Sequence, residues 1–192
     1  MTEVKCNTCR AAVADYNAVH FGSLGTGYRN LCSRCFNEEV ARTRKLEFEH
    51  IDFEPVDMSD AAGVMRRFHF LVRHMGEQVA LEAFEVRCGE RGGHEFQILD
   101  DATVDLLELF ARAVERMRRT LALRHLVDDG LRLSIADTTV RGRVSCDPDR
   151  DFRFPMLVID GRNVSWDQFG LMLMTFEGWQ FKLEIKDWNE EV

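Results

Sequence analysis

Two pairs of cysteines lie near the N-terminus, Cys6 and Cys9 in "CNTC" and Cys32 and Cys35 in "CSRC". Two residues separate the thiols of each pair, which is the spacing that lets both sulfurs bind one tetrahedral metal ion. The residues between the pairs, 10–31, suffice for a β-hairpin that brings the pairs together. The sequence therefore predicts one zinc ion bound by Cys6, Cys9, Cys32 and Cys35.

This zinc is expected to be structural, because four thiolates leave no coordination position open for water or substrate. Iron in the same ligand set, two redox-active CxxC sites, and chance are the alternatives. The redox alternative is weaker because neither pair lies in a strand–helix context of the thioredoxin kind. Loss of the metal is expected to unfold residues 1–46, since so short a unit buries little apolar surface.

The elements around these cysteines form what we call the finger, residues 1–46. A short strand is predicted in "AAVADYNAVHF", a loop tip in the glycine-rich "GSLGTG", and a returning strand in "YRNL". A helix follows in "FNEEVARTRKL", with Phe36, Val40 and Thr43 on one face. This order of knuckle, hairpin and helix resembles the treble-clef class of zinc fingers over about residues 4–46. The resemblance implies metal binding but no particular function, because such fingers bind proteins, nucleic acids or neither.

The rest of the chain is predicted to be a linker and one domain. Residues 47–63 contain six acidic residues and no Lys or Arg, which favours a linker, with an edge strand around Ile51–Phe53 as the alternative. Residues 64–192 are expected to form an α+β domain with a mainly antiparallel sheet, one long helix and one short helix. The stretch "SWDQFGLMLMTFEGWQFKLEI" is similar to uncharacterised bacterial domains of unknown function, a likeness that implies no activity.

Alternating and helical patterns predict the elements of this domain. Strands are expected in "RRFHFLVRH", "QVALEAFEV" and "EFQIL", and a long helix in "TVDLLELFARAVERMRRTLALRHL". The predicted apolar stripe of that helix consists of Leu107, Phe110, Val114, Met117 and Leu121.

Further strands are expected toward the C-terminus. Alternation predicts one at Leu131–Ile135 and one at Val140–Val144, and "DGR" predicts a hairpin turn between "FRFPMLVI" and "NV". Ser165 and Gln168 have the spacing of a capping box that opens a short helix. Phe181, Leu183 and Ile185 alternate with charged residues, which predicts a final strand with one face in solvent.

Other chemically capable residues give weaker patterns. Cys88 and His94 bracket "GERGG" and can be imagined as a nucleophile and base, but an idle cysteine in a hairpin loop is favoured. The acidic stretch 147–151 begins like a calcium loop, yet Phe152 stands where glycine is required. His69 and His74 are five residues apart on a predicted strand, so they face opposite sides. No nucleotide-binding loop or nucleophile-elbow motif is present.

Charge argues against nucleic acid as the main partner. The formal net charge is −8, so the overall field repels phosphates. Arg112, Arg116 and Arg119 share a face of the long helix, but Glu108–Arg112 and Glu115–Arg119 have the spacing of ion pairs on a solvated surface. A local basic patch remains open for the finger, from Arg29, Arg34, Arg42, Arg44 and Lys45.

These patterns favour a zinc-stabilised protein-binding or regulatory module without enzymatic activity. One alternative is a nucleic-acid-associated regulator that uses the finger. Another is an enzyme whose site combines Cys88, His94 and the acids around 147–151. The polar N-terminus and the short apolar stretches predict a cytoplasmic protein without a membrane partner. Two surfaces are expected to meet a protein partner, the tip at residues 22–27 and the exposed edge of the C-terminal sheet.

Overall fold

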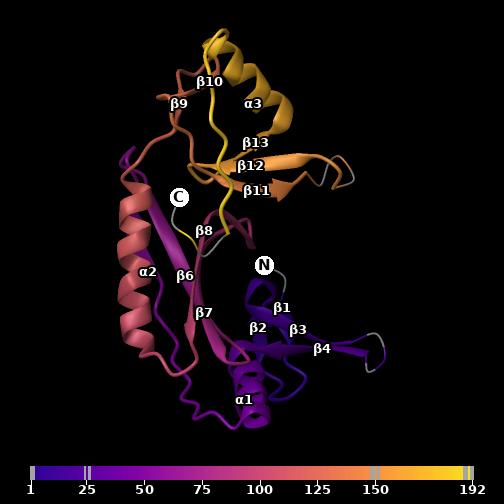
Figure 1. The fold of residues 1–192 in the computed structure, drawn as a ribbon. Coiled ribbons are helices and arrows are strands. Elements are labelled where there is room, and N and C mark those ends of the chain that lie inside the picture. Colours follow the sequence, from indigo (N-terminus) through magenta and orange to yellow (C-terminus); the bar gives the residue numbers. More distant parts are fainter. Residues whose placement is uncertain are drawn as a thin grey trace.

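The computed structural model describes residues 3–23, 25, 27–147, 150, 152–187 and 190. Within them the fold is a mixture of helices and antiparallel sheets (Figure 1). Its α-helices are α1 (Ser33–Arg44), α2 (Leu106–Leu121) and α3 (Trp166–Leu173). The finger contains β1 (Glu3–Lys5), β2 (Ala12–Ala14), the 3-10 turn η1 (Asp15–Asn17), β3 (Ala18–Ser23) and β4 (Gly27–Cys32).

The remaining elements form a central sheet and a C-terminal unit. The central sheet has the strand order β5-β6-β7-β8, with β5 at Val56–Ser59, β6 at Met65–Met75, β7 at Gln78–Arg87 and β8 at Glu90–Asp101. The C-terminal unit combines α3 and the 3-10 turn η3 (Met174–Phe176) with β9 (Leu126–Asp128), β10 (Leu133–Ile135), β11 (Arg143–Cys146), β12 (Pro155–Ile159) and β13 (Arg162–Ser165). Buried apolar residues form a separate cluster in the finger, the central sheet and the C-terminal unit.

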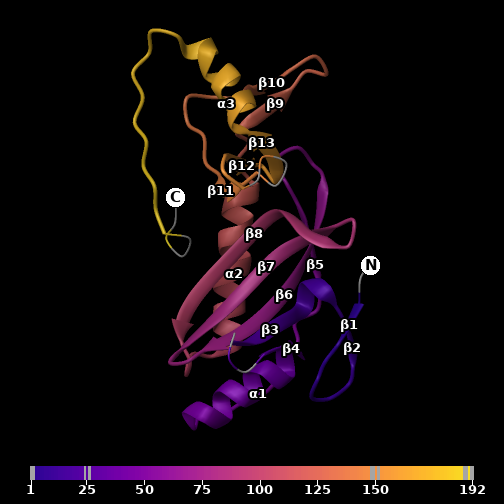
Figure 2. The ribbon, with the colours of Figure 1, turned by 90° about the vertical axis from the view of Figure 1, so that its right-hand side faces the viewer.

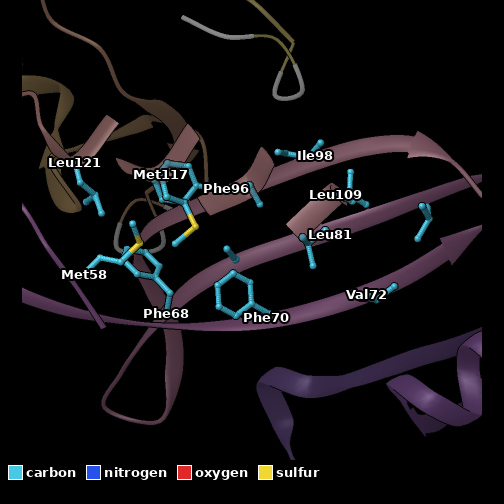
Figure 3. Packing of buried hydrophobic residues seen from close by; sticks show 13 residues of the cluster. Met58, Phe68, Phe70, Val72, Leu81, Phe96, Ile98, Leu109, Met117 and Leu121 are labelled. Atoms are coloured by element: carbon cyan, nitrogen blue, oxygen red, sulfur yellow. The ribbon is translucent and has the colours of Figure 1, made fainter. Parts of the chain in front are cut away.

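Helix α2 covers one face of the central sheet, and this contact forms the largest core (Figure 3). Phe68, Phe70 and Val72 of β6 point into it, because every second residue of a strand lies on the same face. Each large apolar side chain buried here stabilises the fold by about 1.5–3 kcal/mol. Asp105 caps the start of α2 by accepting a hydrogen bond from the Leu107 amide at 2.7 Å.

The buried face of α2 differs in part from the predicted stripe. Met117 and Leu121 are buried and Phe110 and Val114 pack against the core as predicted, but Leu107 is 63% exposed, and Leu109 and Ala113 are the fully buried positions before Met117. Apolar residues of α2 form two neighbouring stripes on the helix surface, so their spacing alone does not decide which stripe is buried. The small Ala113 side chain lets the helix lie close to the sheet, which favours the stripe that contains it.

Strand β5 lies inside the stretch predicted as a linker. Its residues pair antiparallel with the first part of β6, from Val56 opposite Phe68 to Ser59 opposite Met65. The alternative strand around Ile51–Phe53 is not formed, but Phe53 stacks on Phe110 with ring centroids 4.4 Å apart. The acidic segment therefore contributes a strand to the central sheet and an aromatic side chain to its core. The domain boundaries at residues 46–47 and 63–64 stay predictions.

The C-terminal unit confirms two local signals of the sequence. Asp160 and Gly161, both with positive φ, make the turn between β12 and β13. Ser165 and Gln168 form the predicted capping box at the start of α3. The predicted strand from Leu131 begins only at Leu133, and Leu131 itself is 95% exposed.

The predicted C-terminal strand is not formed within the described residues. The C-terminal tail, which we define as residues 177–187, leaves η3 and runs as an extended segment beside the C-terminal unit (Figure 2). Phe181, Leu183 and Ile185 are 89%, 74% and 79% exposed. The predicted strand is therefore wrong for these residues, because alternation alone does not make a strand: its backbone groups also need a neighbouring strand.

The finger is joined to the central sheet by a buried asparagine. The Asn37 side chain of α1 donates to the carbonyl of Val72 at 2.8 Å and accepts from the amide of His74 at 2.9 Å. Both groups belong to the part of β6 that β5 does not reach. One side-chain amide thus replaces the hydrogen bonds that a further strand would make to this edge.

The opposite side of the finger contacts the sheet through Tyr16. Its ring lies against His69 and Phe84, with centroids 5.8 and 5.9 Å away, and its carbonyl accepts from Arg91 Nε at 3.0 Å. Arg91 also lies over the Phe84 ring and pairs with the buried Glu82 at 2.6 Å. The finger therefore covers the face of the central sheet that α2 leaves free.

Replacing Asn37 with Ala is expected to lower the free energy of unfolding by about 2–4 kcal/mol, because it leaves a buried carbonyl and a buried amide without partners. Urea denaturation at neutral pH measures the loss. Asn163→Ala on the exposed face of β13 is the matched control and should change stability by less than about 0.5 kcal/mol. Equal stabilities for the two variants would show that Asn37 does not fix the finger.

No helix among the residues described above is long and apolar enough to pass through a membrane.

Candidate metal centre

The four cysteines of the finger converge on one point. Their sulfur atoms all lie within 4.8 Å of one another. Cys9 Sγ and Cys32 Sγ, which come from different pairs, are 3.8 Å apart. A tetrahedral zinc site with Zn–S bonds of about 2.3 Å has sulfur–sulfur separations of about 3.8 Å. The cluster can therefore hold a metal ion with little movement, and it is the single such group of His, Cys, Asp or Glu found among the described residues.

The first pair is positioned by a tight turn between β1 and β2. The Arg10 amide donates to the Cys6 carbonyl at 3.0 Å, and Arg10 adopts a left-handed conformation with φ of 65°. Asn7 ties this turn to the second strand of the hairpin: its amide donates to the Asn30 carbonyl at 2.7 Å, and its side chain accepts from the Asn30 amide at 2.8 Å. These bonds bring the turn beside the end of β4.

The second pair lies where β4 becomes α1. Cys32 is both the last residue of β4 and the N-cap of α1, and its sulfur accepts from the Cys35 amide at 3.5 Å. Cys35 lies in the first turn of the helix, where the free amide groups of the helix stabilise negative charge. Helix α1 begins at Ser33, within the second pair, and not after it as the sequence pattern indicates.

The surroundings of the thiols favour an unequal distribution of protons. Burial raises the pKa of the Cys6 thiol, but the backbone amides of Cys32, Cys9 and Thr8 outweigh it and lower that pKa to about 6. Burial, reinforced by hydrogen bonding to Cys32, raises the pKa of Cys35 well above its ordinary value. A metal cation bound by the four sulfurs would displace whatever protons they still hold, because metals bind the thiolate.

The centre is partly shielded from solvent. Cys6 and Cys35 are buried together with Leu31, and Phe21 and Phe36 pack against this cluster. The rings of Phe21 and Phe36 contact each other edge to face, with centroids 5.6 Å apart. Cys9 is exposed at the surface. A four-sulfur set with amide donors and an apolar surround fits a structural metal ion, which such a small apolar cluster needs for stability.

Cys88 lies in a hairpin turn, as the favoured interpretation of the sequence has it, and the alternative of Cys88 and His94 as nucleophile and base finds no support in their surroundings. Cys88 lies exposed in the turn between β7 and β8, with φ of 54°. His94 is directed to a carboxylate, with Nδ1 3.5 Å from Oε2 of Glu85, and its ring lies beside the Gly161 turn. Of the acids in 147–151, Asp147 is buried, while Asp149 and Asp151 lie outside the described residues.

Arg112 of α2 has a partner other than the predicted one, because it binds Asp100 of β8 and not Glu108 of its own helix. Arg116 donates to the carbonyl of Gln97 at 3.1 Å and to that of Glu190 at 2.9 Å. These two arginines therefore contact neighbouring parts of the chain, while the predicted Glu115–Arg119 pair stays a prediction.

The predicted basic patch on the finger is only partly available. Arg29 lies over the Phe21 ring and forms an ion pair with Glu39, which neutralises its charge locally. The remaining residues of the patch are exposed on α1 or at its C-cap, namely Arg34, Arg42, Arg44 and Lys45.

Sequence reasoning missed a buried charged network where the central sheet meets the C-terminal unit. Glu85 accepts from Arg87 Nη2 at 2.7 Å and from the His94 amide at 2.8 Å, and Arg66 lies 3.5 Å away. Arg87 also donates to the Gly161 carbonyl at 2.6 Å, which joins the two parts. The available signal was the pair of glutamates inside the otherwise apolar run "QVALEAFEV".

Comparisons with known proteins divide the chain into three matches. Family models described as domains of unknown function match residues 5–47 (DUF7685), 49–122 (DUF7686) and 124–190 (DUF7713). No curated protein and no solved structure matches the chain.

Proposed function

We propose that the chain is a zinc-stabilised protein-binding module. The metal part of the proposal is supported by the closed cluster of Cys6, Cys9, Cys32 and Cys35. Zinc is the metal of choice because it is the common structural ion for four thiolates in tetrahedral geometry. The four sulfurs would fill every coordination position of the ion. Its role would therefore be structural, holding the finger against the central sheet.

We further propose that the finger belongs to the treble-clef type. The support is the order of its elements: a cysteine turn, the β3–β4 hairpin, and a second cysteine pair of which one member caps α1. In a plain zinc ribbon the second pair would lie in another hairpin and not at the start of a helix.

The protein-binding part rests on one observation, the exposed apolar side chains of the C-terminal tail. Trp179, Phe181, Leu183 and Ile185 are 66–89% exposed on consecutive alternate positions. Soluble proteins rarely expose so many large apolar side chains together except where they meet a partner. The cavity near His94 has about 80 Å³ and the one between α1 and the end of β6 about 250 Å³, so both lie below the roughly 300–1,000 Å³ of typical ligand sites, which favours a protein partner over a small-molecule substrate.

The competing proposal is nucleic-acid binding through the finger, which a titration tests directly. We expect the zinc-loaded chain to bind mixed single- and double-stranded oligonucleotides no more tightly than about 10⁻⁴ M at physiological salt, because the net charge is −8. Fluorescence anisotropy and gel shift measure the affinity. Arg42→Glu together with Arg44→Glu should leave this weak binding nearly unchanged.

Sub-micromolar binding that disappears in the Arg42→Glu, Arg44→Glu variant would favour nucleic acid and reject the protein-binding proposal. Arg112→Glu is the matched control, because Arg112 lies on α2 beside Asp100 and away from the finger. The Arg112→Glu substitution should not affect nucleic-acid binding made by residues of α1.

A further inference from the structure

The C-terminal tail has the composition of a strand but lacks a partner strand among the described residues. Phe181, Leu183 and Ile185 lie on one side of the extended chain, and Lys182, Glu184 and Lys186 alternate with them. Lys182 and Glu184 are 3.3 Å apart on the polar side of the tail. An extended chain with one apolar and one charged side is suited to pair with another strand. Pairing satisfies the hydrogen bonds of its backbone groups and helps to bury its apolar side chains.

Within the part of the chain that the structure describes, no strand pairs with the tail. Figure 2 shows the tail running from the end of α3 back toward the middle of α2, separated from the sheets along most of its path. Beyond the tail, Arg116 donates to the Glu190 carbonyl, and the same guanidinium donates to the Gln97 carbonyl of β8. On β8, Glu95 is also engaged, by Arg143 at 2.8 Å. The edge strand of the central sheet is thus partly occupied by side chains.

The tail is complementary to itself in an antiparallel register centred on Leu183. In that register Leu183 faces Leu183 of a second copy, Phe181 faces Ile185, and Lys182 faces Glu184. The symmetry repeats each pair, so both Lys182–Glu184 contacts join opposite charges and no like charges face each other. Opposite charges directly across an antiparallel pair stabilise it, and like charges weaken it.

Resting on the proposed protein-binding function, we infer that the partner of the tail is a second copy of this chain, bound as an antiparallel strand pair centred on Leu183. Such a pair uses the same surface on both copies, as two-fold symmetric dimers do. The backbone groups of residues 181–185 then find partners, and the apolar side chains of the two tails lie on one face of the ribbon.

That apolar face needs a surface beneath it, since a two-stranded ribbon alone is marginally stable in water. The elements that lead into the tail supply one. Leu171 of α3 is 74% exposed and Met174 of η3 is 60% exposed, and Trp179 at the start of the tail is 66% exposed. The dimer therefore buries apolar surface of α3, η3 and the tail together.

The oligomeric state of the full, zinc-loaded chain tests this inference. Sedimentation equilibrium over about 1 µM to 1 mM should show a concentration-dependent dimer. Lys182→Glu should raise the dissociation constant roughly tenfold or more, because it places like charges opposite Glu184 twice in the symmetric pair. Glu184→Lys should do the same, and the double variant Lys182→Glu, Glu184→Lys should restore the dimer.

Disulfide trapping tests the register. In a background with Cys88→Ser and Cys146→Ser, Leu183→Cys should cross-link to itself, since directly facing residues have Cα atoms about 4.5–5.5 Å apart. Phe181→Cys should not, because the two Phe181 positions are separated by about 13 Å along the ribbon. A mixture of Phe181→Cys and Ile185→Cys chains should cross-link between the two variants.

A chain that stays monomeric at about 1 mM overturns the inference, as does a dimer that Lys182→Glu leaves intact, which indicates pairing with another edge such as β8. Equal cross-linking of Phe181→Cys and Leu183→Cys overturns the register. A monomer that retains zinc and ignores nucleic acid leaves the proposed function standing, whereas sub-micromolar nucleic-acid binding rejects that function in any oligomeric state. Bound zinc in every variant shows that the finger is folded.

Discussion

Cys32→Ser is expected to abolish stoichiometric zinc binding and to unfold the finger, while the wild-type chain should contain one zinc ion. Structural zinc sites of this kind contribute about 10–16 kcal/mol of apparent binding free energy, which is also folding free energy. Cys32 is the most sensitive position because it ends β4, caps α1 and supplies a ligand. Elemental analysis measures the metal, and limited proteolysis should show new cleavage before residue 47.

Cys88→Ser and Cys146→Ser are the matched controls, since both cysteines are exposed and outside the cluster. Each should retain one zinc ion and the protease resistance of the wild type. A strong chelator should reproduce the effect of Cys32→Ser on the wild-type chain. Iron in the purified protein, or an intact finger without any metal, would contradict the prediction.

Glu85→Ala is expected to lower the free energy of unfolding by about 1–3 kcal/mol, because it removes the buried acceptor of the His94 amide and of Arg87 Nη2. The Glu85 side chain is 6% exposed and is surrounded by Arg66, Arg87 and His94. Urea denaturation measures the loss. Glu90→Ala at the exposed start of β8 is the control and should change stability by less than about 0.5 kcal/mol, so equal losses in the two variants would dismiss the network as a stabilising feature.

The same carboxylate should make stability depend on pH. Burial raises the pKa of Glu85, but the hydrogen bonds of His94 and the charges of Arg87 and His94 outweigh it and lower the pKa below its ordinary value. The stabilisation is therefore fully present above the unfolded pKa of about 4.3 and is lost as the pH falls through the lower folded value. Denaturation at several pH values should show a smaller acid-side decline for Glu85→Gln than for the wild type.

The sequence predicted most of the elements whose signals are local. The cysteine spacing identifies the residues that converge, and the Asp160–Gly161 turn and the Ser165 capping box follow from short-range rules. These signals hold because the backbone geometry of a turn or cap depends on only a few consecutive residues.

The errors arise where contacts between distant parts of the chain determine the local structure. The phase of α2 depends on how closely Ala113 lets the helix approach the sheet, and the role of Asn37 depends on a strand edge 35 residues away. The apolar alternation of Phe181, Leu183 and Ile185 predicted a strand, but nothing local specifies whether a neighbouring strand exists. The cysteines that converge were thus accessible from spacing, whereas the contacts that connect the parts were not.

The two hydrogen bonds between Asn37 and β6 have a consequence for a chain without a bound metal ion. Beyond β5, the outer edge of β6 carries the sequence "HFLVRHM", and Asn37 of α1 bonds the Val72 carbonyl and the His74 amide on it. Unfolding of the finger would release α1 and uncover an edge strand that includes Phe70, Leu71 and Val72, and an uncovered edge of this kind is a template for aggregation. Zinc supply during synthesis would then determine whether newly made chains remain separate or join edge to edge into insoluble assemblies.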